Sequence, residues 1–223
     1  MLIDHVGIML FPGITALRVI GRLSFPIYAF MIAEGCKYTK NKIRYFLGIF
    51  GLAAVCQIAF YISSSGLQMG ILVNFSLSIL CIYALQYMKR TVIFEKSSNL
   101  RKLGSIAVFF AVFLGAYIFF RIFEVDYGFI GCMVPVFASI FENEEELPKV
   151  LRRFGIIPVR VMTMGACLLV FVLVNGGYRN FALLSLPLLL LYSGKRGRLK
   201  MKYFFYAFYP LHLALIYFIS EII

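Results

Sequence analysis

Long apolar runs separated by short polar connectors follow one another along almost the whole chain. A helix that crosses a bilayer needs about 20 predominantly apolar residues, and apolar stretches of helical length can be placed at nine positions. They cover residues 1–11, 16–36, 45–62, 69–88, 103–123, 128–141, 156–175, 179–193 and 203–222. The pattern predicts an all-α, polytopic membrane helix bundle of about nine transmembrane helices, built as one domain over residues 1–223.

The positive charges support this count because they gather in every second connector. Most of the 22 Lys and Arg residues lie in clusters at 37–44, 89–102, 149–153 and 195–202. The intervening connectors, 12–15, 63–68, 124–127 and 176–178, contain no Lys or Arg. Basic connectors remain in the cytoplasm. We therefore expect a multi-pass protein of the cell membrane, such as a bacterial inner membrane, with a cytoplasmic N-terminus and an extracytoplasmic C-terminus.

The first apolar run departs from this regular pattern. Residues 1–11 end at Pro12-Gly13 and, at about 1.5 Å per residue, span only about half of a bilayer. Either the first span is short or its cytoplasmic half lies upstream of Met1. The expected number is therefore eight full spans and at least half of a ninth.

Composition narrows the possible partners. The residues are 62% apolar and 14% charged, and the mean hydropathy is +0.90, so lipid is the main solvent of the chain. The net charge of +12 does not indicate nucleic acid, because no water-facing surface remains to form a groove. The five cysteines form no CxxC pair and are expected to be buried thiols. No metal is expected, and homo-oligomerisation is left open.

Ionisable residues within the first two spans are the main candidates for chemistry. Arg18 and Arg22 lie one turn apart on the same helix face. Both His5 and Arg22 lie about 10 Å below the outer surface, and Asp4 is one residue deeper than His5. Charged groups inside a membrane are costly and usually functional. The alternative is an Asp4–Arg22 ion pair that only joins two helices. Asp4 points about 100° away from His5, so it is not simply the partner that orients His5.

The second histidine, His212, also lies within a span. It is about 14 Å from the cytoplasmic side, and Pro210 just before it loosens the local backbone. A hydrogen-bonded structural histidine and a catalytic one are both compatible with this position.

The remaining polar residues have structural alternatives. Glu34, Gln57 and Asn74 could join helices by hydrogen bonds or lie around a substrate. Asp126, in an outer turn, could bind a cationic substrate or be solvated.

Three arginines lie near the ends of spans. Arg121, Arg160 and Arg179 can extend their side chains to the membrane interface, and Arg160 could also contact an anionic ligand.

Two classes of function fit these residues. An acyltransferase acting across the membrane needs a cytoplasmic site for an anionic acyl-CoA, an intramembrane base or nucleophile and an opening to an outer acceptor. A secondary transporter needs an ionisable residue at mid-depth and broken helices. No Walker, HExxH or GxSxG motif is present, which disfavours an ATP-driven pump or a zinc or serine hydrolase.

Three strings together resemble the TraX family, named after a conjugative-pilin N-acetylase. They are MLIDHVGIMLFP at the start, LRVIGRLSFPIYAFMIAEG followed by Lys37-Tyr38-Thr39, and FFYAFYPLHLALIYFI near the end. The family pattern usually has a longer first helix. The resemblance also extends to the wider transmembrane acyltransferase superfamily, whose members transfer acetyl groups from cytoplasmic acetyl-CoA to extracytoplasmic acceptors.

This resemblance implies acetyl transfer from acetyl-CoA to a protein N-terminus, a glycan or a small molecule, with the acceptor's identity left open. We expect His5 to act as general base or transient acyl acceptor, and Arg22, with Asp4, to position it and stabilise the oxyanion. The candidates for binding the CoA phosphates are Lys37, Lys42 and Arg44. The candidates for substrate binding or for supporting the catalytic residues are Arg18, Glu34, Asn74, Asp126 and His212.

Overall fold

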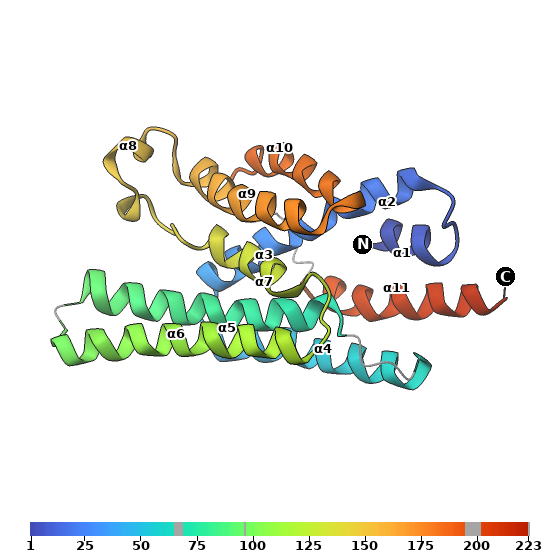
Figure 1. The fold of residues 1–223 in the computed structure, drawn as a ribbon, viewed down its shortest axis with the longest axis horizontal. Coiled ribbons are helices and arrows are strands. Elements are labelled where there is room, and N and C mark those ends of the chain that lie inside the picture. Colours follow the sequence, from blue (N-terminus) through green and yellow to red (C-terminus); the bar gives the residue numbers. More distant parts are fainter. Residues whose placement is uncertain (65–68, 96, 195–201, 223) are drawn as a thin grey trace. The chain divides into compact units, whose positions relative to one another are not determined.

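The structure is a computed structural model that describes residues 1–64, 69–95, 97–194 and 202–222 (Figure 1). Within these ranges the regular elements are helical, and the only β contact is an isolated bridge between Met69 and Val125. The helices are α1 (Leu2–Met9), α2 (Thr15–Arg22), α3 (Ser24–Tyr38), α4 (Lys42–Ser64), α5 (Ile71–Lys89), η1 (Arg90–Phe94), α6 (Asn99–Ile122), α7 (Gly128–Ala138), η2 (Glu144–Glu146), α8 (Lys149–Arg152), α9 (Ile156–Asn175), η3 (Gly177–Leu184), α10 (Ser185–Leu190) and α11 (Lys202–Ile222).

The fold class predicted from the hydropathy pattern is confirmed. Among the described residues, five segments are long and apolar enough to cross a membrane. They are Thr15–Tyr38, Lys42–Tyr61, Ile71–Ile93, Asn99–Ile122 and Ile156–Asn175. Most of the apolar surface of α4 and α6 faces outward, where only lipid can solvate it. The chain is thus a helical membrane protein.

Of the other expected spans, 203–222 corresponds to the 21-residue α11, and the rest form shorter helices. Residues 1–11 give the eight-residue α1, and 128–141 give the 11-residue α7. The expected span 179–193 is not one α-helix, because a 3₁₀-helix, η3, precedes the six-residue α10. Pro187 explains this break, since its ring nitrogen cannot donate the hydrogen bond that would continue an α-helix through Leu183.

The expected span 16–36 bends at Leu23, between α2 and α3. Pro26 cannot donate a hydrogen bond to the carbonyl of Arg22, so the α-helical ladder is interrupted there. The Ser24 hydroxyl donates to the Gly21 carbonyl at 2.7 Å and satisfies one acceptor at the bend. The bend leaves Arg22 at the end of α2 rather than inside a continuous helix.

The chain divides into two compact units, and α3 and α9 each contribute to both. The first unit comprises residues 1–28 and 168–223, and the second comprises residues 29–167. In the second unit α5 is the central helix, in contact with α4, α6 and α7, and it lies beside α6 along its length (Figure 1). Its buried residues include Asn74, Ser78 and Ile82. The expectation of a single domain remains a prediction.

Within the second unit the basic connectors meet at one end. The ammonium of Lys42 donates to the Gln86 side chain at 2.7 Å, and that of Lys89 donates to the Ile140 carbonyl at 2.8 Å. At the opposite end, Met69 is bridged to Val125. The alternation of connectors predicted from the sequence is thus present in this unit. The basic residues 195–201, Lys96 and the connector residues 65–68 lie outside the described residues.

In the first unit, α1 and α2 form a hairpin whose helices approach closely. A Cβ atom at Gly21 would lie 2.6 Å from the Cα of Asp4, and one at Gly7 would lie 2.9 Å from the Cβ of Leu17. Small residues at a helix contact allow backbones to come this near. The hairpin also packs through α1 against α11 and through α2 against η3, which brings residues from both ends of the chain together.

Candidate functional site

The close α1–α2 contact places one carboxylate between two guanidinium groups. Asp4 Oδ2 lies 3.4 Å from Arg22 Nη2, and Asp4 Oδ1 lies 3.4 Å from Arg18 Nε. The two arginines share one face of α2, as their spacing predicted. The Arg18 guanidinium also lies 5.7 Å from the centroid of the Tyr178 ring. Asp4 therefore joins the arginines, and the ion pair considered as a structural alternative is present.

His5 lies one residue from this ion-pair cluster and contacts the second histidine of the chain. The Nδ1 atom of His5 is 3.3 Å from Nε2 of His212, and the two ring centroids are 5.3 Å apart. His212 is buried on α11, where its ring stacks on Phe208 one turn earlier. Residues more than 200 positions apart in the sequence thus form one histidine pair in the first unit.

The hydrogen bonds of this pair fix the position of its protons when both rings are neutral. Nδ1 of His212 lies 2.8 Å from the Phe208 carbonyl, which can only accept, so this nitrogen carries the hydrogen. Nε2 of His212 is then an acceptor, and Nδ1–H of His5 donates to it. The remaining nitrogen, Nε2 of His5, keeps its lone pair. A chain of two imidazoles anchored on a backbone carbonyl therefore presents a base.

The second unit holds a separate buried ion pair. Arg160 is 2% exposed, its Nη1 pairs with the Glu34 carboxylate, and its Nε donates to the Ala138 carbonyl at 2.8 Å. The guanidinium also lies 5.0 Å from the centroid of Phe30. The expectation that Arg160 extends to the membrane interface is wrong, because a carboxylate and a carbonyl inside the unit satisfy its charge. Glu34 joins α3 to α9 rather than standing alone.

Asn74 and Asp126 meet at the end of α5 opposite the basic connectors. The buried Asn74 amide donates to the carbonyls of Asp126 at 2.8 Å and Gly128 at 3.0 Å. Between them Tyr127 has φ +66°, a left-handed conformation that costs free energy for a residue with a side chain. Asn74 therefore holds a strained turn in place, and its contact is with the backbone of Asp126.

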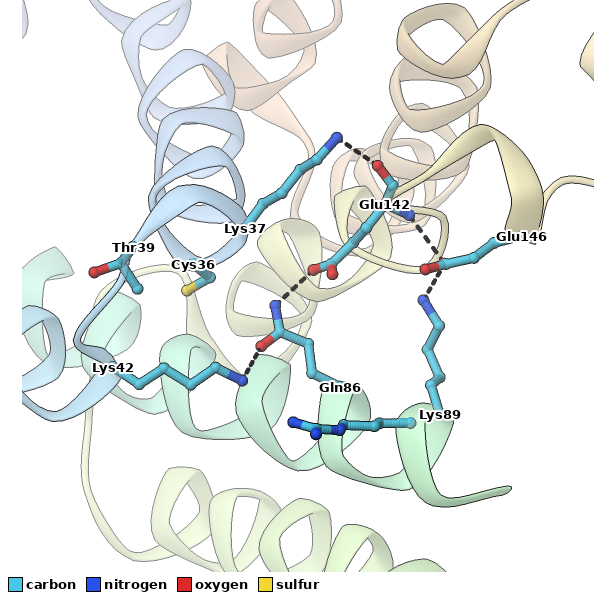
Figure 2. A pocket seen from close by; sticks show the side chains of 9 residues that line it. Cys36, Lys37, Thr39, Lys42, Gln86, Lys89, Glu142 and Glu146 are labelled. Carbon is cyan, nitrogen blue, oxygen red and sulfur yellow. Dashed lines mark hydrogen bonds and ion pairs between the residues drawn. The ribbon is translucent and has the colours of Figure 1, made fainter. Parts of the chain in front are cut away.

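Two of the three candidate CoA-binding residues line one pocket of about 260 Å³ in the second unit. Lys37 and Lys42 point into it from α3 and α4 (Figure 2). The remaining lining residues are Cys36, Thr39, Gln86, Lys89, Arg90, Glu142 and Glu146. Arg44 does not join them but lines another cavity, of about 490 Å³, with Asn41 and Leu47. The cluster proposed from the sequence is thus divided between two cavities.

Sequence reasoning missed three features of these sites. It did not pair His5 with His212, because the depth of a residue in the membrane, counted from the nearest connector, does not say which helices are neighbours. It did not assign Lys89 and Glu146 to the pocket, although the alternation of connectors already placed their loops on the same side as Lys37. It did not recognise that Arg160 is buried, although its position within an apolar run was a signal.

Comparison with known proteins gives the family of the chain. Neither the curated proteins nor the solved structures include a significant match. The family model described as TraX protein matches residues 1–220, which is almost the entire sequence and includes both histidines. The chain therefore belongs to the TraX protein family.

Proposed function

We propose that this membrane protein transfers an acetyl group from cytoplasmic acetyl-CoA to an extracytoplasmic acceptor. The observation that carries the proposal is the histidine pair, in which Nε2 of His5 keeps its lone pair while Nδ1–H donates to His212. Membership of a family named after a pilin acetylase supports the same reaction. Imidazole is the side chain best suited to proton transfer near neutral pH.

The free lone pair supports two routes of acetyl transfer. As a general base, Nε2 of His5 takes the proton of the acceptor's hydroxyl or amine while that oxygen or nitrogen attacks the thioester carbonyl. The C–S bond breaks, and CoA leaves as a thiolate that takes the proton. As an acyl acceptor, Nε2 attacks the thioester carbonyl itself, the C–S bond breaks, and the Nδ1 proton of His5 passes through Nε2 of His212 to the departing CoA thiolate. The acceptor's hydroxyl or amine then attacks the acetyl carbon, the bond between that carbon and Nε2 breaks, and the acceptor's proton returns to Nδ1 of His5. In the general-base route His212 stabilises the positive charge that develops on His5, and in the acyl-acceptor route it takes up the proton that His5 releases.

The neighbouring charges suit the oxyanion of either route. Arg18 and Arg22 supply two guanidinium groups to the single carboxylate of Asp4, so the cluster is positive overall. A guanidinium fixed in a site of low dielectric constant stabilises the negative oxygen of the tetrahedral intermediate without reorganising. Asp4 holds both arginines on the α2 face beside His5.

The basic end of the second unit supports the proposed direction of the reaction. By the positive-inside rule, the end that carries Lys37, Lys42 and Lys89 is cytoplasmic, and this is where acetyl-CoA is available. We assign its phosphates to Lys37 and Lys42. The acceptor on the opposite side is a protein N-terminus, a glycan or a small molecule, and no residue of this chain specifies a pilin.

The test is incubation of the purified protein, in lipid nanodiscs, with radiolabelled acetyl-CoA. We expect acetyl-CoA turnover to fall by about 10²- to 10⁴-fold in His5→Ala. His212→Ala should lose less, about 10- to 100-fold, because His5 keeps its lone pair but loses the fixed orientation. In the absence of an acceptor, label retained on the protein and absent from His5→Ala would establish the acyl-acceptor route.

Ile8→Ala is the matched control, because Ile8 is exposed on the same short helix and truncating it removes no chemistry. Its turnover should equal that of the unaltered protein. Wild-type turnover in His5→Ala would refute the catalytic proposal. Flux of a substrate into proteoliposomes without CoA, together with no consumption of acetyl-CoA, would instead establish the rival function of secondary transport.

A further inference from the structure

The pocket at the basic end of the second unit has an unusual arrangement of charge. The ammonium groups of Lys37, Lys42 and Lys89 converge on this pocket, which has a volume of about 260 Å³. That volume is several times the roughly 30 Å³ taken up by one water molecule in the liquid, so a phosphate group fits. The lysines lie on α3, α4 and α5, and Figure 2 shows their side chains reaching toward one region.

Most of the lysine hydrogen bonds in this pocket are made to neutral oxygens. Lys37 donates to the backbone carbonyl of Glu142, and Lys42 donates to the Gln86 side-chain oxygen at 2.7 Å. Lys89 donates to the Ile140 carbonyl and pairs with the Glu146 carboxylate. Within the described part of the chain, neither Lys37 nor Lys42 makes an ion pair with a carboxylate. The ammonium groups of Lys37 and Lys42 are therefore hydrogen-bonded to neutral oxygens and not directly ion-paired.

The two carboxylates of the pocket accept hydrogen bonds much as phosphate oxygens would. Glu146 accepts from the Lys89 ammonium and from the backbone N–H of Glu142 at 3.1 Å. Glu142 accepts from the Gln86 amide at 2.7 Å, and the oxygen of that amide is held by Lys42 (Figure 2). A combination of ammonium, amide and backbone N–H donors is typical of sites that bind phosphate.

We propose that this pocket binds the phosphate groups of an anionic ligand, and that Glu142 and Glu146 occupy the same donors until the ligand displaces them. The acidic segment 142–146 is then a built-in competitor that lowers the affinity for the ligand. This proposal deepens the proposed function, on which it rests for the identity of the ligand as CoA. A phospholipid headgroup offers the same chemistry from the surrounding bilayer.

The competitor role predicts a gain of affinity, which distinguishes it from a structural role. CoA, dephospho-CoA and phosphate-free pantetheine would be titrated by calorimetry against the purified protein in phosphatidylcholine nanodiscs. We expect Glu146→Gln and Glu142→Gln each to bind CoA about three- to tenfold more tightly, because each loses the charge that competes with phosphate. Lys42→Gln should bind CoA about tenfold more weakly, since it loses one charge-assisted hydrogen bond. Pantetheine should respond to none of these changes.

The acidic segment 142–146 and the basic connector 37–44 also supply matched controls. Glu144 lies between the two pocket carboxylates in sequence but does not line the pocket, and Lys40 precedes Lys42 without lining it. Glu144→Gln and Lys40→Gln repeat the change of charge and should leave CoA affinity within about twofold, which separates pocket contacts from general electrostatics.

A second arm separates the two sources of phosphate. Native mass spectrometry would count phosphatidylglycerol molecules retained by each variant. Increased lipid retention in Glu146→Gln, with CoA binding weak and insensitive to Lys42→Gln, would assign the pocket to a lipid headgroup. Unchanged or weakened binding of both CoA and phosphatidylglycerol in the two Glu→Gln variants would overturn the proposal. Because these experiments measure binding without turnover, their outcome does not depend on whether His5→Ala loses acetyl transfer.

Discussion

Each unit contains a group of buried charges within its apolar helices, and these two groups differ in composition. In the second unit, Arg160 and Glu34 form a neutral pair that a backbone carbonyl and an aromatic ring complete. In the first unit, the Asp4 carboxylate lies 3.4 Å from the guanidinium groups of both Arg18 and Arg22, and a pair of histidines lies beside it. A neutral pair that bridges two helices is suited to holding them together. A positive cluster beside an imidazole base is suited to stabilising negative charge in a reaction.

The side-chain exposure of the three arginines ranks the expected effects of replacing them. Arg160 is 2% exposed, Arg22 is 12% exposed and Arg18 is 25% exposed. Burial strengthens both the Coulomb attraction of a pair and the penalty for leaving one partner alone. Stability should therefore depend most on Arg160 and activity most on Arg22.

The largest expected effect is on stability. Arg160→Leu leaves the Glu34 carboxylate without its partner, so we expect the free energy of unfolding to fall by about 3–5 kcal/mol. The double variant Glu34→Leu/Arg160→Leu should recover most of that loss, since two apolar residues replace the whole pair. The midpoint of thermal unfolding in detergent, followed with the yield of monodisperse protein, measures both.

Arg179→Leu is the control for this comparison, because Arg179 is an exposed arginine of η3. It should leave the midpoint unchanged. If the double variant is no more stable than Arg160→Leu alone, the buried pair is not what holds this part of the second unit together.

The next effect is on activity. Arg22→Lys keeps the positive charge beside Asp4 but replaces a planar, multi-donor group with a single ammonium. We expect acetyl-CoA turnover to fall by about 10- to 100-fold while the unfolding midpoint shifts by only a few degrees. A fall in turnover that merely follows the loss of folded protein would place Arg22 with Arg160 as a structural residue.

The smallest effect is expected at Arg18. Its guanidinium is the most exposed of the three. Removing its contact with Asp4 leaves the contact between Arg22 and Asp4 intact. Arg18→Gln should lower the free energy of unfolding by no more than about 1 kcal/mol and turnover by about three- to tenfold, because the cluster loses its excess positive charge while Arg22 keeps its contact with Asp4. A loss larger than that of Arg22→Lys would reverse the roles assigned to the two arginines of α2.

Much of this organisation could be predicted from local sequence. The period and length of the apolar runs predicted an all-helical membrane protein, because lipid leaves the backbone few ways to satisfy its hydrogen bonds. The spacing of Arg18 and Arg22 predicted their shared face. The alternation of basic connectors predicted which ends of the second unit's helices meet, and Lys37, Lys42 and Lys89 do lie together there.

Other features depend on which helices become neighbours. Arg160 was expected at the interface, and only the packing of α3 and α7 against α9 supplies the carboxylate and carbonyl that bury it. Arg44 follows Lys42 by two residues and was assigned to the same ligand, yet the direction of its side chain on α4 places it in another cavity. Hydropathy carries no information about such contacts, since every lipid-facing helix has a similar pattern.

The sequence by itself determined the fold class, the alternation of the connectors, the family and the residues able to carry charge or protons within the membrane. It determined these because each depends on composition, on helical period or on short strings of neighbouring residues. Only the tertiary structure paired His5 with His212 and turned the lysines of three helices toward two carboxylates. Such contacts join residues far apart along the chain, and they form because packing removes the alternatives that the sequence leaves open.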